Sequence, residues 1–205
     1  MREAMREPTL FPEYERHRGA MKFGDVIAFS GRGGSSEIIK QLSVWKGGRE
    51  ISHVGMVYPS PDSSVLILES TTLVDLPDAV DRSVHKGVQL HWLSKRLSNY
   101  DGEAWWVPLK TPFDVIASQE VYSWCRRCHE KKIKYDTIQA LGAGLDFWDS
   151  IFENERDYSK LFCSEMVSRA LQLGRKIGRG VNPSEVMPFE VVSFPCLVES
   201  PVKIK

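Results

Sequence analysis

The 205-residue sequence predicts an α+β fold, because strand patterns dominate its first half and helical patterns its second half. The clearest strand signals are VIAFS at 26–30 and the pair ISHVGMV and VLILES at 51–57 and 65–70, which a Pro- and Asp-containing turn joins into a hairpin. Apolar residues at helical spacing occupy three later segments, 113–132, 137–152 and 162–173. Together these patterns predict an antiparallel sheet packed against helices.

Composition and charge argue against a protein that binds nucleic acid or spans a membrane. Lys plus Arg and Asp plus Glu both number 27, so no net charge draws the chain to nucleic acid. The apolar runs are strand-sized, and the N-terminal region has no stretch of signal-peptide length, so we expect a cytoplasmic protein that does not insert stably into a membrane. Four cysteines are few for this length and are expected to be reduced thiols.

A single domain suffices for a chain of this length. Residues 1–21 are polar and contain Pro8 and Pro12, so we expect a lead-in without a helix, followed by one domain over residues 22–205. Gly174 is expected to end the helix at 162–173 in a left-handed conformation. The remaining expected elements are helices at 35–45 and 94–100 and strands at 88–93, 103–109 and 189–194.

Cys163 is the candidate nucleophile. It lies in KLFCSEMVSRAL, at the start of a helix with apolar residues on one face. The first turn of a helix presents backbone N–H groups and the positive end of the helix dipole, which favour the thiolate form of a cysteine. A buried structural cysteine is the ordinary alternative, so the hypothesis needs a nearby base.

His53 in the first strand of the hairpin is the candidate base. If the hairpin turns symmetrically about Pro61, Val57 faces Val65 and His53 faces Glu69. A carboxylate at that position orients an imidazole and selects its tautomer. The register is an assumption, and Asp75 is the reserve candidate for the orienting carboxylate.

These motifs, in this order, resemble a known family. GDVIAF, SHVGMV, the strand that ends at Glu69, and FCSEMVSRAL are similar to the circularly permuted NlpC/P60 hydrolases of the YiiX type, also called permuted papain-like amidases. KKIKYDTIQALG and NPSEVMPFEVV add similarity before and after the cysteine helix, so that the resemblance spans residues 22–195. It implies a permuted papain-like fold and a triad of His53, Glu69 and Cys163.

The resemblance and the residues together predict a cysteine hydrolase that cleaves a peptide-like or acyl-amide bond without a cofactor or metal. Tyr135, in the Tyr-Asp segment, is a candidate for binding substrate or the oxyanion. Two alternatives remain open. One is an acyltransferase or lipid hydrolase like the lecithin:retinol acyltransferase family, whose NCEH nucleophile context FCSE does not reproduce, and the other is a non-catalytic binding module.

Three further signals have simpler interpretations. Cys125, Cys128 and His129 form CRRCH, which matches a haem-attachment pattern and could supply zinc ligands with Cys196, but lies within a predicted helix and lacks a second ligand pair. GRGGSS at 31–36 lacks the ending of a phosphate-binding loop. The remaining histidines and tryptophans of interest are expected to be structural or to lie on the surface: His17, His85, His91, Trp45, Trp105 and Trp106.

Overall fold

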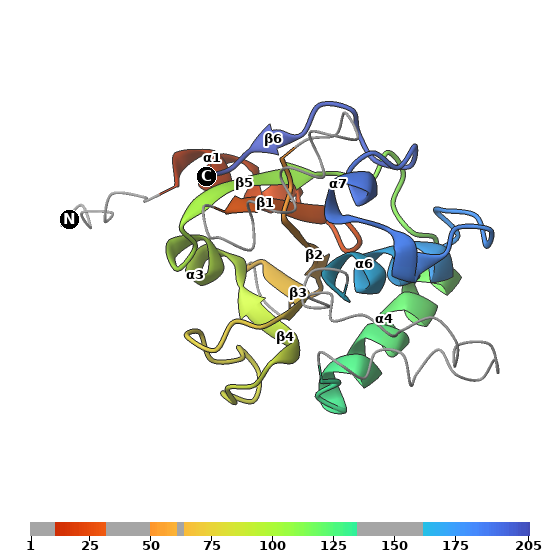
Figure 1. Ribbon diagram of the computed structural model, residues 1–205. Helices are drawn as coiled ribbons and strands as arrows, with labels where there is room; N and C mark the ends of the chain where they lie inside the picture. Colours follow the sequence, from red (N-terminus) through yellow and green to blue (C-terminus); the bar gives the residue numbers. More distant parts are fainter. Residues whose placement is uncertain (1–10, 32–49, 61–63, 135–161) are drawn as a thin grey trace, which may run out of the picture.

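One antiparallel sheet forms the centre of the molecule (Figure 1). The computed structural model describes residues 11–31, 50–60, 64–134 and 162–205. The six strands have the order β4-β3-β2-β1-β5-β6, and every neighbouring pair is antiparallel. Their bounds are β1 Val26–Gly31, β2 His53–Tyr58, β3 Leu66–Thr71, β4 Gly87–Trp92, β5 Gly102–Val107 and β6 Val202–Lys203. The helices and strands confirm the predicted α+β class.

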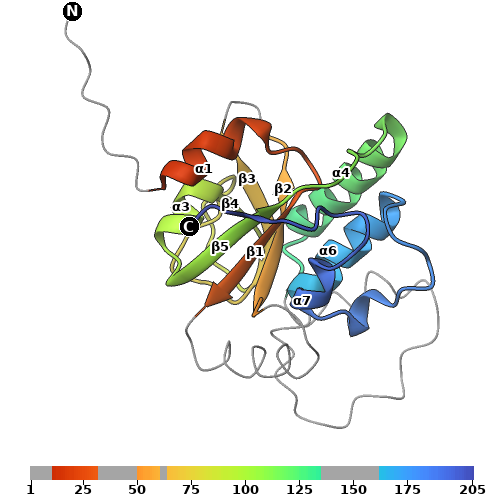
Figure 2. The ribbon, with the colours of Figure 1, turned by 90° about the horizontal axis from the view of Figure 1, so that it is seen from above.

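Helices cover both faces of this sheet (Figure 2). The α-helices are α1 Pro12–His17, α3 Leu93–Ser98, α4 Val115–Glu130, α6 Phe162–Leu173 and α7 Pro188–Val191, and the 3-10 helices are η1 Arg18–Ala20 and η3 Pro183–Glu185. The helices α4, α6 and α7 lie on one side of the sheet, and α1 and α3 lie on the other. None of the helices in the described parts of the chain is long and apolar enough to cross a bilayer.

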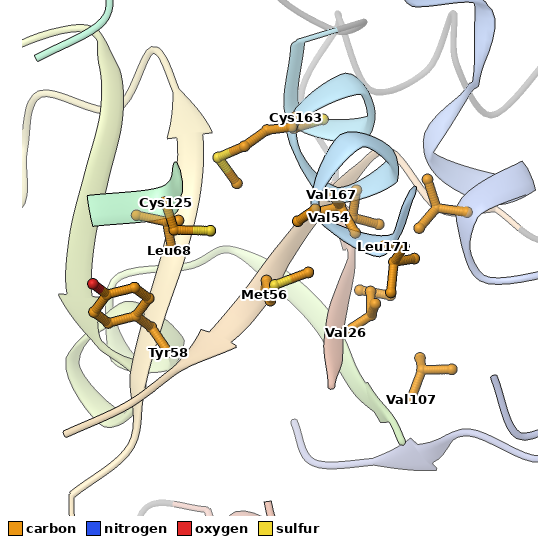
Figure 3. Packing of buried hydrophobic residues seen from close by; sticks show 14 of the residues in the cluster. Val26, Val54, Met56, Tyr58, Leu68, Val107, Cys125, Cys163, Val167 and Leu171 are labelled. Atoms are coloured by element: carbon orange, nitrogen blue, oxygen red, sulfur yellow. The ribbon is translucent and has the colours of Figure 1, made fainter. Parts of the chain in front are cut away.

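Strand alternation produces two separate hydrophobic clusters. In β2, Val54 and Met56 pack with α6, whereas Val57 packs on the opposite face with Ile67 and the α3 residues. Figure 3 shows Val167 and Leu171 of α6 beside Val54 and Val26 of the sheet. Burial of this apolar stripe fixes α6 against the central strands.

Asp25, in the turn before β1, connects three parts of the fold. Its Oδ2 atom accepts hydrogen bonds from the indole N–H of Trp106 at 2.8 Å and the backbone N–H of Lys22 at 2.9 Å, and its Oδ1 atom accepts from the Leu109 N–H at 2.9 Å. The carboxyl group is buried, and burial raises its pKa despite these three donors. The residue thereby joins the start of β1 to β5 and to the segment after it.

Most expected elements are present within one or two residues of their predicted bounds, but three expectations are wrong. Pro12 does not prevent a helix: it occupies the first turn of α1, where its missing N–H costs no hydrogen bond, and Tyr14 is buried. Residues 188–191 are helical rather than extended, because Pro188 starts α7 and Glu190 accepts from the Met187 N–H. The expected helices at 35–45 and 137–152 lie outside the described residues.

The third wrong expectation concerns the end of α6. The left-handed residue is Arg175, with φ of 57°, rather than Gly174. The N–H of Lys176 donates to the Leu171 carbonyl at 2.8 Å, as in a Schellman motif. Gly174 is instead required by packing, because a Cβ atom there would overlap the ring of Phe113. The same ring packs against Gly24, so Phe113 ties the end of α6 to the turn before β1.

Candidate active site

His53 is the first residue of β2, opposite Phe29 of β1. Its ring lies against the Phe29 ring, with 5.6 Å between centroids, and its side chain is 17% exposed. The Nε2 atom lies 2.6 Å from Oε2 of Glu69 on β3. An imidazole held between an aromatic ring and a carboxylate has little freedom to rotate. The two residues expected to form the base and its orienting group are therefore in contact.

The contact arises from a different register than the one expected. Val57 pairs with Ile67 rather than Val65, so β3 is shifted by two residues relative to the symmetric hairpin. The expected direct pairing of His53 with Glu69 is wrong. Because side chains alternate with a period of two, a two-residue shift keeps Glu69 on the face where it was expected, and the carboxylate reaches His53 along the diagonal.

Cys163 is the second residue of α6 and is fully buried. Its side chain forms a hydrogen bond with His53. Because the Nε2 atom of His53 is bound to Glu69, Nδ1 is the ring nitrogen left to face the sulfur. The structure thus brings Cys163 and Glu69 to opposite sides of one imidazole, although the residues come from three separate elements.

Charge dominates the protonation of this imidazole. Burial lowers the pKa of His53, but the charge and hydrogen bond of Cys163, together with those of Glu69, outweigh that effect and raise it to about 9. These two partners therefore favour the protonated ring. Burial also raises the pKa of Glu165, two residues after Cys163, to about 7.

Glu69 has two further partners that sequence reasoning missed. Arg96 of α3 donates from Nε to Oε1 at 2.7 Å, and Nδ1 of His91 on β4 lies 2.9 Å from the same oxygen. Burial of Glu69 raises its pKa, but the charge of Arg96 and the hydrogen bonds from His53 and His91 hold it well below the usual range. His91 was expected to be structural or superficial, and it is fully buried. The one available signal was its strand position, on the same face as Glu69.

The other candidate residues lie elsewhere. Asp75 is exposed, and the carboxylate bound to His53 belongs to Glu69. Tyr135, Trp45 and all of GRGGSS after Gly31 lie outside the described residues. The assignment of Tyr135 therefore stays a prediction.

The CRRCH segment forms part of α4 and packs into the core. Cys125 and Cys128 are buried, and burial raises the pKa of both thiols. His129 binds Asp78, with Nε2 2.8 Å from Oδ2. Among the described residues, no three or more His, Cys, Asp or Glu side chains are arranged to hold a metal ion. The Asp78 carboxylate instead joins α4 to the loop before β4.

A cavity of about 680 Å³ opens at the end of the sheet where β2 begins. Its described walls come from β1, β5, the segment after α7 and residues 50–51, which immediately precede β2. The lining combines apolar residues with three carboxylates: Ala28, Ser30, Glu50, Ile51, Glu103, Trp105, Val107, Val192, Glu199, Ser200 and Pro201. Its described lining includes none of His53, Glu69 and Cys163, so the cavity is not assigned to the candidate site.

Comparison with known proteins supports the fold at the level of structure alone. Neither a protein-family model nor a curated protein matches the sequence. The chain is similar to the crystal structure of metalloprotein yiiX from Escherichia coli O157:H7, DUF1105, with a TM-score of 0.54 and 15% identity over 90% of this chain and 98% of that chain. The protein therefore has a YiiX-like α+β fold.

Proposed function

We propose that this chain is a cysteine hydrolase of the permuted NlpC/P60 type, in which Cys163 is the nucleophile, His53 the proton carrier and Glu69 the orienting group. One observation carries the proposal: the imidazole of His53 forms a hydrogen bond with Glu69 and another with Cys163. The chain order of these residues, with the histidine before the cysteine, is the order expected of the permuted family. The position of Cys163 in the first turn of α6 also favours a thiolate.

The first half of the reaction forms a thioester. The Cys163 thiolate attacks the carbonyl carbon of the substrate, and the C=O π electrons move to the oxygen. The His53 imidazolium gives its proton to the leaving amine nitrogen as the C–N bond breaks. Backbone N–H groups of the first turn of α6 are suitable donors to the oxyanion. The products are an acyl-Cys163 thioester, a free amine and neutral His53.

The second half consumes water. Neutral His53 takes a proton from a water molecule while its oxygen attacks the thioester carbon, and the C–S bond breaks to release the carboxylic acid and the Cys163 thiolate. Glu69 stays ionised throughout, because Arg96 and the two imidazoles stabilise its charge. Its role is to hold the ring orientation and to stabilise the imidazolium.

A metal-dependent alternative fits these residues poorly. The structurally similar YiiX protein is described as a metalloprotein. In the described part of this chain, the oxygens of Glu69 face the Arg96 guanidinium and two imidazoles. A guanidinium at this distance opposes the binding of a cation to the same carboxylate. The proposed reaction therefore involves no metal ion.

An amide is the preferred substrate class. A lipid enzyme of this size would be expected to reach its substrate through an apolar anchor or a basic amphipathic segment. The formal charge is zero, and the basic residues of GRKIGRG are interrupted by glycines.

The test of the nucleophile is thiol mapping. At pH 7 we expect iodoacetamide to label Cys163 at least about 10-fold faster than Cys196, because only Cys163 contacts an imidazolium that stabilises the thiolate. Cys196 is the matched control: it is partly exposed, and burial raises its pKa. Mass spectrometry of the folded protein gives both rates. His53→Ala should reduce the Cys163 rate to that of Cys196.

Burial of Cys163 is addressed with a second reagent. Methyl methanethiosulfonate is small and uncharged, so its rate of reaction depends less on access to the buried thiol than on the reactivity of that thiol. If Cys163 reacts no faster than Cys196 with either reagent, the thiol is not activated, and the non-catalytic binding module becomes the better interpretation.

The substrate class is decided by a side-by-side assay. The purified protein is incubated with peptidoglycan-type peptides, acyl-lysine amides and phospholipid vesicles, with Cys163→Ala as the blank. We expect cysteine-dependent release of an amine from at least one amide and no release of fatty acid from the vesicles. Fatty acid release without turnover of any amide would instead establish the acyltransferase or lipid hydrolase alternative.

A further inference from the structure

The two oxygens of Glu69 have different partners. Oε1 accepts from Nε of Arg96 at 2.7 Å and lies 2.9 Å from Nδ1 of His91, whereas Oε2 faces Nε2 of His53 at 2.6 Å. The carboxylate is fully buried. Two donors on Oε1 leave Oε2 directed at His53, and they prevent the carboxylate from turning away.

We propose that Arg96 and His91 are positioning residues for the reaction, which keep Glu69 ionised and reserve its Oε2 atom for His53. The inference rests on the proposed function, because it assigns these residues a role in preparing His53. Neither residue touches Cys163 through a described contact, so both act through Glu69.

Arg96 is held for this role by its surroundings. Its side chain is 5% exposed, and its guanidinium lies 4.8 Å from the ring centre of Phe29 and 5.0 Å from that of Tyr100. A buried carboxylate without a compensating cation would take up a proton. Arg96 is the fixed cation that removes this cost, and a protonated Glu69 would no longer stabilise the His53 imidazolium.

His91 connects Glu69 to a loop. Its Nδ1 atom faces Glu69, and its Nε2 atom lies 3.2 Å from the carbonyl oxygen of Leu76. Both neighbours are hydrogen-bond acceptors, and each lies next to a different nitrogen of the ring. The ring therefore performs two separable tasks, donation to the carboxylate and attachment of the loop after β3. Substitutions can separate them.

The experiment measures the protonation of His53 directly. Side-chain ¹⁵N NMR of the five histidines is recorded against pH, with resonances assigned by single substitutions. The charged and titratable groups around the pair are Cys163, Glu69, His91, Arg96 and Tyr100. In the unmodified chain we expect His53 to titrate near pH 9. Arg96→Met should lower this midpoint by at least about 1 pH unit, because Glu69 then loses its charge.

The coupling between substitutions of Arg96 and Glu69, measured on the His53 midpoint, distinguishes a positioning role of Arg96 from a structural one. Glu69→Gln should lower the midpoint by a similar amount, and adding Arg96→Met to it should change the midpoint little further. Arg96→Lys keeps the charge and should give a smaller shift than Arg96→Met. Arg126→Met is the matched control, because Arg126 pairs with Glu130 on the exposed surface of α4. Backbone amide spectra establish that each variant is folded.

Two substitutions of His91 test its two tasks separately. Asn carries an N–H₂ group close to the Nδ1 position and can still donate to Glu69, whereas Gln carries one close to Nε2 and can still donate to the Leu76 carbonyl. We expect His91→Asn to leave the His53 midpoint closer to that of the unmodified chain than His91→Gln does. The reverse order would overturn the role of His91 and leave only the loop attachment. The His91 pair and Arg96→Lys decide the matter if Arg96→Met does not fold.

The outcomes distinguish this inference from the proposed function. A midpoint unchanged in Arg96→Met, with a shift in Glu69→Gln, overturns the positioning role of Arg96 while the triad stands. A His53 midpoint near its ordinary value in the unmodified chain, together with an unreactive Cys163, overturns the proposed function itself.

Discussion

If the proposed function holds, His53→Ala is expected to lower kcat/KM on an amide substrate by about 10⁴-fold, because it removes the group proposed to stabilise the thiolate and to carry the proton. Glu69→Gln is expected to cost less, about 10- to 1,000-fold, which corresponds to the 1–3 pKa units that a neighbouring carboxylate is worth to an imidazolium. Steady-state kinetics of the two variants beside Cys163→Ala gives the order of damage.

The exposed Asp75 provides the matched control for Glu69. Asp75→Asn removes a carboxylate from the loop after β3 without touching His53 through a described contact, so its activity should equal that of the unmodified chain. A fully active Glu69→Gln protein would show that the carboxylate does not orient His53. Loss of activity in Asp75→Asn would return that role to the reserve candidate.

Asp25→Ala is expected to lower the free energy of unfolding by about 3 kcal/mol, because it leaves the buried Trp106 indole N–H and the Leu109 N–H without their acceptors. Removal of the buried carboxyl group also relieves its own desolvation cost, which offsets part of the loss. Denaturant unfolding followed by tryptophan fluorescence measures the change.

A double substitution identifies the cause. Trp106→Phe removes the donor that Asp25→Ala leaves unsatisfied, so the two changes together should cost less than the sum of the two alone. The exposed Asp101 is the control, and Asp101→Ala should change stability by less than about 0.5 kcal/mol. Strict additivity of Asp25→Ala and Trp106→Phe would mean that their hydrogen bond is not the source of the stability.

Sequence patterns predicted the hairpin well because period-two alternation is local. They placed His53 and Glu69 on one face, and that placement is correct although the predicted register is wrong by two residues. The register itself depends on the geometry of the turn, which composition does not determine. Contact between the two residues was therefore predictable, but their direct pairing was not.

Interactions that depend on packing were not predictable in the same way. Arg96 follows β4 in a short helix, and only the packing of α3 against the sheet brings its guanidinium to Glu69. The segment around Val191 has the composition of a strand, yet Pro188 and the Glu190 side chain start a helix there. At that position helix capping and packing determine the structure, and they outweigh the local strand propensity.

The order of the elements along the chain has a consequence for biosynthesis. β2, β3, β4 and α3 carry His53, Glu69, His91 and Arg96, and they precede α6, which carries Cys163. During translation the emerging chain can form the hairpin before the cysteine has been made. The Cys163 thiol then meets His53, its proposed base, through a contact of long sequence separation, and such contacts form slowly in folding. In a nascent or misfolded chain Cys163 would lack this contact, so rapid alkylation of Cys163 would report that folding is complete.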